Sequence, residues 1–496
     1  MGTILNYIYK LFFLSRYEKL MGRLKDAVAA QEQIRKTLIK RNINTKIGKE
    51  FQFATITSYE NFKRQIPVRS YEIIEPEILR CMEGIQNEFW CDDIKKFGKS
   101  SGTTSRSKYI PLTMEGLKEN HYRGGIDMIT MYLKHFPSSE LFNGKNLVIS
   151  GSFENRKNIS VGDISAHIIK NLPFWIRYYR IPSLKISLER DWNYKLNKIT
   201  VEAIKQKMVA LSGIPSWMMV LLQKMKDDQA FSRRYWKDIE VFFHGGIHFE
   251  PLKLKFEELL EREINYFQLY NATEGFFAMQ EKFGTLDMLL LTHHGIFYEF
   301  AAIENYKPNY DKVDAIADVE VGKNYEMIIT TNSGLWRYAL GDIVEITQKN
   351  PTKILVIGRT KQYINIYGEE LMVHNAELGM AAACLIHQCT FIDFTAAPLL
   401  LEHEKGCHEW WIEFDKKPKD IDAFARELDN QLRLLNSDYD AKRTDDLLLQ
   451  NLKVKSLPEK TFYNWLASNK KLGGQHKVSK LKNNRQFLEE LYAFID

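Results

Sequence analysis

Hydrophobic positions follow a helical period near the start of the chain. Leu20, Leu24 and Leu38 belong to one apolar stripe, which predicts a helix over roughly residues 15–41. Residues 4–14 are more apolar still, but they lack the basic start and the small-residue cleavage site of a signal peptide. We expect them to form a helix that packs on the body of the protein, rather than an anchor on a membrane surface.

From about residue 140 onward, short apolar runs stop at small or turn-forming residues, as strands do when they deliver a loop to a site. Helical stretches lie between the first of these runs, so we expect an α/β core. The later runs follow one another without helices and predict an antiparallel sheet or a small barrel over residues 285–358. The first runs cover residues 147–149, 239–243 and 266–270.

Two further stretches complete the expected organisation. Thr113 is the expected N-cap of a helix that runs to about Phe136, where Pro137 stops it. Beyond Gly358 the pattern predicts a small α+β domain ending at Asp496. Its expected elements are helices at about 374–386 and 419–435 and strands near 391–396 and 409–414.

Composition and charge narrow the possible classes of protein. The chain has 496 residues, of which 45% are hydrophobic and 27% charged, which excludes a mainly disordered or fibrous protein. The net charge of +6 is too small and too widely spread to indicate nucleic acid as a partner. Five cysteines form no disulfide framework, so we expect a reducing, cytoplasmic location. No apolar stretch is long enough for a membrane-spanning helix.

Candidate chemistry begins with the segment FGKSSGTTSRSK, from Phe97 to Lys108. Small hydroxyl residues around a glycine let the backbone approach a polyphosphate, and a nearby lysine adds positive charge. The spacing differs from that of a Walker A loop. A solvated turn rich in serine and threonine is the alternative for this segment alone.

Two more turns carry a hydroxyl or a carboxylate next to glycine. In the segment YNATEG, the hydroxyl of Thr273 and the carboxylate of Glu274 could bind phosphate together with Mg²⁺, or form a capped strand-to-helix turn. In the segment WRYALGD, Asp342 could bind a ribose diol, or it could be a turn residue between two strands. Arg359 could add a second contact to the ribose or a phosphate.

The chain also ends in a basic, glycine-containing segment. Residues 470–485 contain six lysines and arginines and no acidic residue. A solvated basic face is the simpler interpretation for most of them. A single lysine on such a loop, Lys477, could still close over a phosphate.

Taken together and in this order, these segments resemble the motifs of the adenylate-forming, firefly luciferase-like superfamily. In particular they resemble its GH-three branch, the acyl acid–amido synthetases, in a bacterial-type form. Residues 100–104, 270–275 and 336–342 look like the three ATP motifs, and residues 474–478 fit the family's C-terminal segment. The resemblance spans nearly the whole chain.

The resemblance implies an α/β fold of two parts joined by a hinge. Residues 1–360 would form a large N-terminal adenylation domain of β-sheets flanked by helices, with a β-barrel. Residues 361–370 would be the hinge, and residues 371–496 a small, mobile α+β domain. We expect a monomer or a weak dimer.

The resemblance also implies a reaction. A carboxylate would attack the α-phosphate of ATP, giving an acyl-adenylate and pyrophosphate, and an amine, usually of an amino acid, would then take the acyl group. By matched position, catalysis would fall to Lys477 and Glu274, and Glu274 would also bind Mg²⁺. Nucleotide binding would fall to Ser100, Ser101, Gly102, Thr103, Thr104, Gly245, Gly246, Tyr270, Thr273, Asp342 and Arg359.

Two positions depart from the family pattern. The first loop lacks a second glycine after Thr104, and Glu370 stands about where plant members carry a lysine. Two other functions remain open: transfer of the acyl group to a thiol such as coenzyme A, and nucleotide binding without turnover.

The acid-binding pocket is harder to place from the sequence. Several large side chains next to the motifs could line a pocket for an aromatic acid, or could be plain core. They are Met218, Phe276, Phe277, Tyr298 and Phe300. The His293–His294 pair, and His403 with Cys407 and His408, match no standard zinc spacing, so we expect no metal site there.

Overall fold

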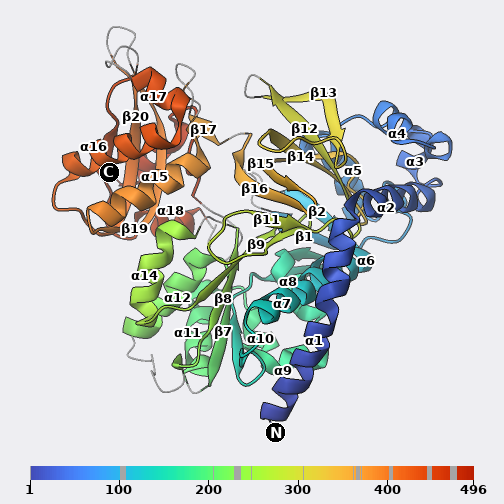
Figure 1. Cartoon of the computed structure of the whole chain (residues 1–496), viewed down its shortest axis with the longest axis horizontal. Coiled ribbons are helices and arrows are strands. Elements are labelled where there is room, and N and C mark those ends of the chain that lie inside the picture. The colour runs from blue at the N-terminus through green and yellow to red at the C-terminus, as the bar shows by residue number, and fades with distance from the viewer. Residues whose placement is uncertain are drawn as a thin grey trace.

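The computed structural model describes most of the chain, and Figure 1 shows its arrangement. The described residues are 2–100, 108–204, 206–227, 236–246, 249–304, 307–360, 362–364, 369, 371–401, 406–443, 449–469 and 478–495. None of the helices in these ranges is long and apolar enough to cross a bilayer.

A mixed sheet of twelve strands runs through the middle of the described structure (Figure 1). Its parallel strands continue without a break into antiparallel ones, because β9 pairs with β10, β10 with β11, and β11 with β16. In sheet order the strands are β13 (Lys307–Ala315), β12 (Ile296–Glu304), β14 (Asn324–Thr331), β15 (Tyr338–Lys349), β16 (Thr352–Arg359), β11 (Met288–Leu290), β10 (Phe276–Gln280), β9 (Asn265–Asn271), β8 (Val241–Gly245), β7 (Met208–Gly213), β3 (Lys145–Val148) and β6 (Arg180–Ile181).

The strands predicted from the apolar runs are present. The runs at 147–149, 239–243 and 266–270 correspond to β3, β8 and β9, which lie in the parallel part of the sheet. The antiparallel strands predicted for residues 285–358 are also present. They share one hydrogen-bonded sheet with the parallel strands rather than standing apart from them.

A second, four-stranded sheet carries the first predicted phosphate loop. β1 (Lys96–Ser100) pairs antiparallel with β2 (Lys108–Leu112) and parallel with β5 (Ile159–Gly162), which in turn pairs with β4 (Phe153–Arg156). The sequence pattern did not predict β1 and β2, because each is only five residues long and is mixed in polarity.

The N-terminal apolar stripe forms two helices instead of the single one predicted. α1 (Gly2–Lys25) and α2 (Ala27–Arg41) are separated at Asp26. Phe13 of α1 is fully buried in a cluster with residues of α7, so the apolar start packs on the body as expected. Phe12, its neighbour, is 53% exposed.

The helix predicted after Thr113 is interrupted by a wider turn. Thr113 caps it as expected, and its hydroxyl accepts a hydrogen bond from Gly116 N at 2.8 Å. The helical stretch then passes through η2 (Leu117–Tyr122), which is π-helical, into α7 (Arg123–His135). Such turns often occur at functional sites, and η2 lies beside the second predicted motif.

The remaining helices surround the two sheets. They are α3 (Lys46–Glu50), η1 (Phe53–Thr55), α4 (Tyr59–Gln65), α5 (Tyr71–Met82), α6 (Met114–Gly116), α8 (Ile164–Lys170), α9 (Phe174–Tyr179), α10 (Leu184–Ser187), α11 (Trp192–Ala203), α12 (Pro215–Asp227) and α14 (Glu250–Leu260).

The C-terminal part has its own sheet and its own buried cluster (Figure 1). It contacts the rest of the chain at α14, where Lys255 pairs with Asp415 at 2.9 Å, and also at β16, against which α15 (Val373–Ile386) packs. The helices and strands predicted here are all present. Its elements are β17 (Tyr363–Ile364), β18 (Leu371–Met372), α15 (Val373–Ile386), β19 (Thr390–Leu400), β20 (Gly406–Lys416), α16 (Ile421–Leu435), α17 (Ser437–Arg443), β21 (Lys453–Ser456), α18 (Thr461–Ser468) and α19 (Gln486–Ile495).

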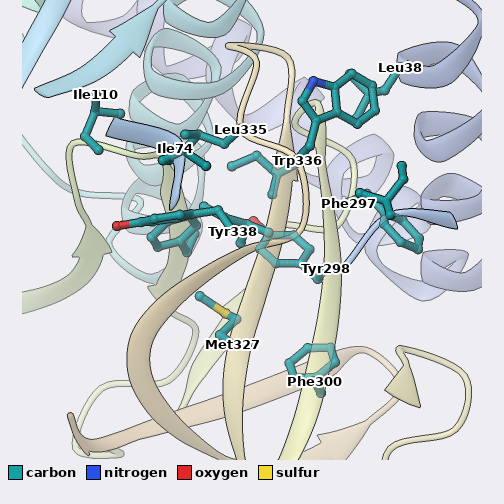
Figure 2. Close-up of a cluster of buried hydrophobic side chains, with 14 of the residues drawn as sticks. Leu38, Ile74, Ile110, Phe297, Tyr298, Phe300, Met327, Leu335, Trp336 and Tyr338 are labelled. Atoms are coloured by element: carbon teal, nitrogen blue, oxygen red, sulfur yellow. The ribbon is translucent and has the colours of Figure 1, made fainter. Parts of the chain in front are cut away.

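The largest hydrophobic cluster joins the N-terminal helices to the antiparallel strands. Figure 2 shows Leu38 of α2 and Ile74 of α5 in the same cluster as Phe297 of β12 and Met327 of β14. Ile110 of β2 belongs to it as well. The hairpin of β1 and β2 is therefore fixed against the body that carries the other two predicted ATP motifs.

Candidate active site

The turn of the second motif joins β9 to β10, so it is a strand-to-strand turn rather than the strand-to-helix turn considered as the alternative. Ala272 N donates to Gly275 O at 2.9 Å and closes the turn. Asn120 of η2 holds the next residue, because its side chain accepts from Phe276 N at 2.7 Å and donates to Phe276 O at 3.2 Å. A Cβ at Gly275 would lie 2.5 Å from Ile296 Cδ1 and 2.8 Å from Phe277 Cε1, so a larger residue there would force these side chains to shift.

Asp342 lies in β15 and is held by two neighbours. Arg359, its register partner in β16, places Nε 2.8 Å from Asp342 Oδ1, and the Tyr270 hydroxyl donates to Asp342 Oδ2 at 2.5 Å. The charge of Asp342 raises the pKa of Arg359, and burial followed by the same charge raises the pKa of Tyr270 well above its usual value. The second and third motifs therefore meet at one carboxylate.

Glu274 lies between charges of both signs. Burial raises its pKa, and the charge of Asp342 acts in the same direction, while Lys108 and Arg359 act against it. A cation beside Glu274 would relieve this penalty, and a carboxylate oxygen is a ligand that Mg²⁺ prefers. The donor chemistry at this position therefore fits a magnesium ion bound together with phosphates.

The first motif approaches the second through β1. A Cβ at Gly98 would lie 2.3 Å from Thr273 Cγ2, so the two segments are in direct contact. Ser100 and Lys108 face each other across the β1–β2 hairpin. Ser101, Gly102, Thr103 and Thr104 lie outside the described residues.

The two predicted adenine-side glycines follow directly from the parallel sheet. Gly245 ends β8 beside Leu269 of β9, and a Cβ there would lie 2.5 Å from Leu269 O. Gly246 has a φ of +87°, which favours glycine. The close approach of the two strands explains why small residues stand at this strand end.

One cavity of about 1900 Å³ is lined by all of the predicted nucleotide-binding residues that lie within the described ranges. It exceeds the roughly 300–1,000 Å³ of a typical small-molecule pocket, which leaves room for more than one substrate. Residues on both sides of positions 361–370 line it, among them Arg359, His374 and Phe391. The predicted members of its wall are Ser100, Gly245, Gly246, Tyr270, Thr273, Glu274, Asp342 and Arg359.

The fold adds polar residues to this wall that no sequence pattern indicated. His121 of η2 lines the cavity and is hydrogen-bonded to Asn271. Burial lowers the pKa of His121 to about 4, so its ring is neutral at pH 7. Its place in a helical stretch gave no signal, because its partner is 150 residues away along the chain.

The side chains considered for the acid-binding pocket do not all lie at the cavity. Among the five large side chains considered for an aromatic pocket, Phe276 lines the cavity, whereas Tyr298 and Phe300 are buried in the hydrophobic core. Lys477 and Glu370 lie outside the described residues.

The histidine pair His293–His294 lies beside the carboxylate of Asp127, which also pairs with Arg16. His294 Nε2 lies 2.9 Å from Asp127 Oδ2, and Arg16 donates to Asp127 Oδ1 at 3.2 Å. His408 instead lies 2.8 Å from a carboxylate oxygen of Glu369. Ligand atoms of Asp127, His293 and His294 lie within 4.8 Å of one another, close enough to hold a metal ion, so the expected absence of a metal site at the His293–His294 pair stays a prediction.

Comparison with known proteins decides the family. Three family models match successive parts of the chain: the GH3 family N-terminal domain over residues 16–193, the GH3 family central domain over 289–359, and the GH3 family C-terminal domain over 374–486. The chain belongs to the GH3 family. The GH-three resemblance of its motifs is therefore confirmed.

The relatives of this GH3 chain are distant. A probable indole-3-acetic acid-amido synthetase of Arabidopsis thaliana is 24% identical over 398 residues, and the match spans 67% of this chain and 66% of the relative, just under two thirds of its length. A solved GH3.15 acyl acid amido synthetase has a TM-score of 0.79 at 18% identity and covers 97% of this chain and 95% of its own.

A second solved structure extends the likeness beyond the GH3 family. A 2-hydroxyisobutyryl-CoA ligase in the postadenylation state has a TM-score of 0.58 at 11% identity, and the match covers 94% of this chain and 91% of that one. At these identities the likeness concerns the fold. The GH3 chain has the mixed α/β adenylate-forming fold that the sequence resemblance implies.

Proposed function

We propose that this GH3 protein uses ATP to adenylate a carboxylic acid and then transfers the acyl group to an amine, such as that of an amino acid, to form an amide. The observation that carries the proposal is the convergence at Asp342. The carboxylate of Asp342, the Thr273–Glu274 turn and the two glycines at the end of β8 face one cavity. Membership of a family of amido synthetases supports the same reaction.

Each of the proposed binding residues would contact a different part of the nucleotide. Asp342 would accept hydrogen bonds from the ribose hydroxyls, with Arg359 fixing the orientation of its carboxylate. Gly245 and Gly246 would leave a flat surface for adenine, and Thr273 would donate to the α-phosphate. Holding the acid and the α-phosphate at attack distance removes much of the entropic cost of the reaction.

Charge is the second requirement of the adenylation step. Mg²⁺, held by Glu274 and the phosphates, would neutralise the charge of the leaving pyrophosphate. Lys108 acts on Glu274 from the end of the first loop. Ser101, Gly102, Thr103 and Thr104 would complete the binding of the β- and γ-phosphates, as the family motif implies.

We further propose that residues 361–370 are a hinge between a large part, 1–360, and a small part, 371–496. The separate sheet and the separate buried cluster of the C-terminal part support this division. Lys477 would arrive with the small part and stabilise the charge that builds up on the α-phosphate. The five cysteines are free thiols, which supports a reducing compartment such as the cytoplasm.

The decisive experiment is acid-dependent exchange of pyrophosphate into ATP, with a panel of acids and with Mg²⁺ present or chelated. We expect exchange that requires both the acid and Mg²⁺, followed by an amide product when amino acids are added. Absence of exchange with every acid, at millimolar ATP, would contradict the proposal.

The same assay separates the two other functions. Coenzyme A in place of the amino acid tests thiol transfer, and a thioester product without any amide would replace the proposed acceptor. Calorimetric binding of ATP without exchange would identify a nucleotide-binding protein that does not turn over.

A further inference from the structure

Part of the cavity wall is apolar and is formed by α7, α8 and the residues that lead from α8 into α9; we call this part the apolar arm. Phe13 of α1 and Phe142 also line the cavity, and their rings stack with centroids 5.5 Å apart. The side chains that line the arm are mainly aliphatic. They include Ile126, Ile129, Ile164, Ile168, Leu172 and Ile176.

Residues of η2 connect the Thr273–Glu274 turn with the apolar arm. His121 contacts Asn271 at the end of β9, and the next residue, Tyr122, packs with Ile164 and Ile168. The Tyr122 hydroxyl donates to Ile168 O at 3.2 Å, so this junction is held in place. An acid whose carboxylate lies at the turn would therefore direct the rest of its chain into the arm.

A glycine inside α7 adds to the width of the arm. Gly125 lines the cavity, and a Cβ built there would meet no atom within 4 Å. Gly124 differs, because its Cβ would lie 2.6 Å from the ring of Phe276. Glycine inside a helix is less stabilising than alanine. Because position 125 is glycine, the volume that a side chain would fill stays part of the cavity and is available to a ligand.

Arg180 is a buried charged side chain on this part of the cavity wall. Its Nη1 donates to Ser187 Oγ at 2.6 Å, whereas its buried Nε has no hydrogen-bond partner among the described residues. Among the aromatic side chains considered for a flat pocket, Phe276 lines the cavity, whereas Tyr298 and Phe300 lie in the core. A single planar ring would leave much of such an aliphatic surface uncovered.

Building on the function proposed above, we propose that the acid substrate is a long-chain aliphatic carboxylic acid whose hydrocarbon tail occupies the apolar arm. Each methylene that moves from water into the arm contributes about 0.8 kcal/mol. That corresponds to roughly a fourfold gain in kcat/KM for each added methylene.

The test compares straight-chain acids from butyrate to palmitate, with benzoate and indole-3-acetate as planar competitors. We expect kcat/KM for pyrophosphate exchange to rise by roughly fourfold per methylene and then to level off when the arm is full. A flat profile, or a preference for either planar acid over decanoate, would overturn the inference.

Two matched glycine substitutions test the position of the tail. Gly125→Leu fills open space in the arm, and we expect it to lower kcat/KM for palmitate by at least about tenfold while butyrate stays within about twofold. Gly22→Leu in α1 is the control, because its Cβ also meets no atom within 4 Å and Gly22 does not line the cavity. An unchanged chain-length profile in Gly125→Leu would count against the inference.

The outcomes separate the inference from the function on which it rests. Exchange with short or planar acids only would retain the ligase and overturn the long-chain substrate. If no acid supports exchange, the proposed function fails, and calorimetric titration with decanoate still decides the inference. Binding that is weakened in Gly125→Leu but not in Gly22→Leu supports the tail site, and absence of binding overturns it.

Discussion

Asp342 shows how one carboxylate can organise several segments. Its two oxygens are engaged by Arg359 and Tyr270, so the side chain is oriented before any nucleotide binds. Asp342→Asn keeps the shape but removes the charge, and a hydrogen bond to a charged group contributes about 1.5–3 kcal/mol. We expect ATP to bind roughly 10- to 100-fold more weakly in calorimetry.

The control for this variant is Asp440→Asn, because Asp440 also pairs with an arginine, at 2.6 Å from Arg433, but lies outside the cavity. It should leave ATP affinity unchanged. Thermal unfolding of both variants would verify the fold. Equal ATP affinity in Asp342→Asn and the wild type would remove Asp342 from the ribose site.

At this scale the sequence predicted the residues that belong to contiguous motifs. Thr273, Glu274 and Asp342 were recognisable because each stands in a short segment with glycine and small neighbours. Asn120 and His121 were not, because their partners, Phe276 and Asn271, are about 150 residues away in the chain. A helical pattern around residue 120 reveals burial but not the identity of the partner.

Among the elements, η2 connects the helices to the second motif. Asn120→Leu would remove both hydrogen bonds to the backbone of Phe276 and leave its buried N–H and C=O without them, at a cost of about 1–3 kcal/mol each. We expect a lower free energy of unfolding in urea and weaker ATP binding, since the Thr273–Glu274 turn immediately precedes Phe276.

A graded variant checks this interpretation. Asn120→Asp keeps an acceptor for Phe276 N and loses the donor to Phe276 O, so its stability and ATP affinity should fall between those of the wild type and Asn120→Leu. Unchanged ATP binding in Asn120→Leu, with stability reduced, would limit η2 to a structural role.

The elements themselves were predicted where local pattern determines them. In the C-terminal part α15, β19, β20 and α16 follow from the sequence pattern, and in the main sheet β3, β8 and β9 follow from apolar runs and their stops. The break at Asp26 and the π-helical turn do not, because packing against other elements decides them. The joining of parallel and antiparallel strands into one sheet depends on the pairing of β11 with β16, which no local pattern reveals.

For the whole molecule, the proposed function requires a group from the C-terminal part at the nucleotide. Lys477→Ala should lower the rate of pyrophosphate exchange by roughly 10²- to 10³-fold, because such a charge acts on the transition state. ATP affinity should stay within about threefold, because the lysine contributes little before the chemical step. Exchange kinetics and calorimetry measure the two quantities separately.

Lys417→Ala, a change at an exposed lysine of the C-terminal part outside the cavity wall, is the control and should affect neither quantity. A parallel fall of ATP affinity and exchange rate in Lys477→Ala would assign Lys477 to ground-state binding. The basic segment at residues 470–485 would then contribute to nucleotide binding rather than to catalysis.

Residues from both sides of positions 361–370 form the wall of the cavity. This arrangement determines how short a functional fragment of the protein can be. Arg359 stands just before residue 361, while His374 and Phe391 face the same cavity from beyond residue 370. A truncated protein ending at residue 360 would retain Asp342 and Thr273 but would leave the chamber open to bulk water. A mixed anhydride is readily hydrolysed, so the smallest unit able to protect one contains both portions of the polypeptide.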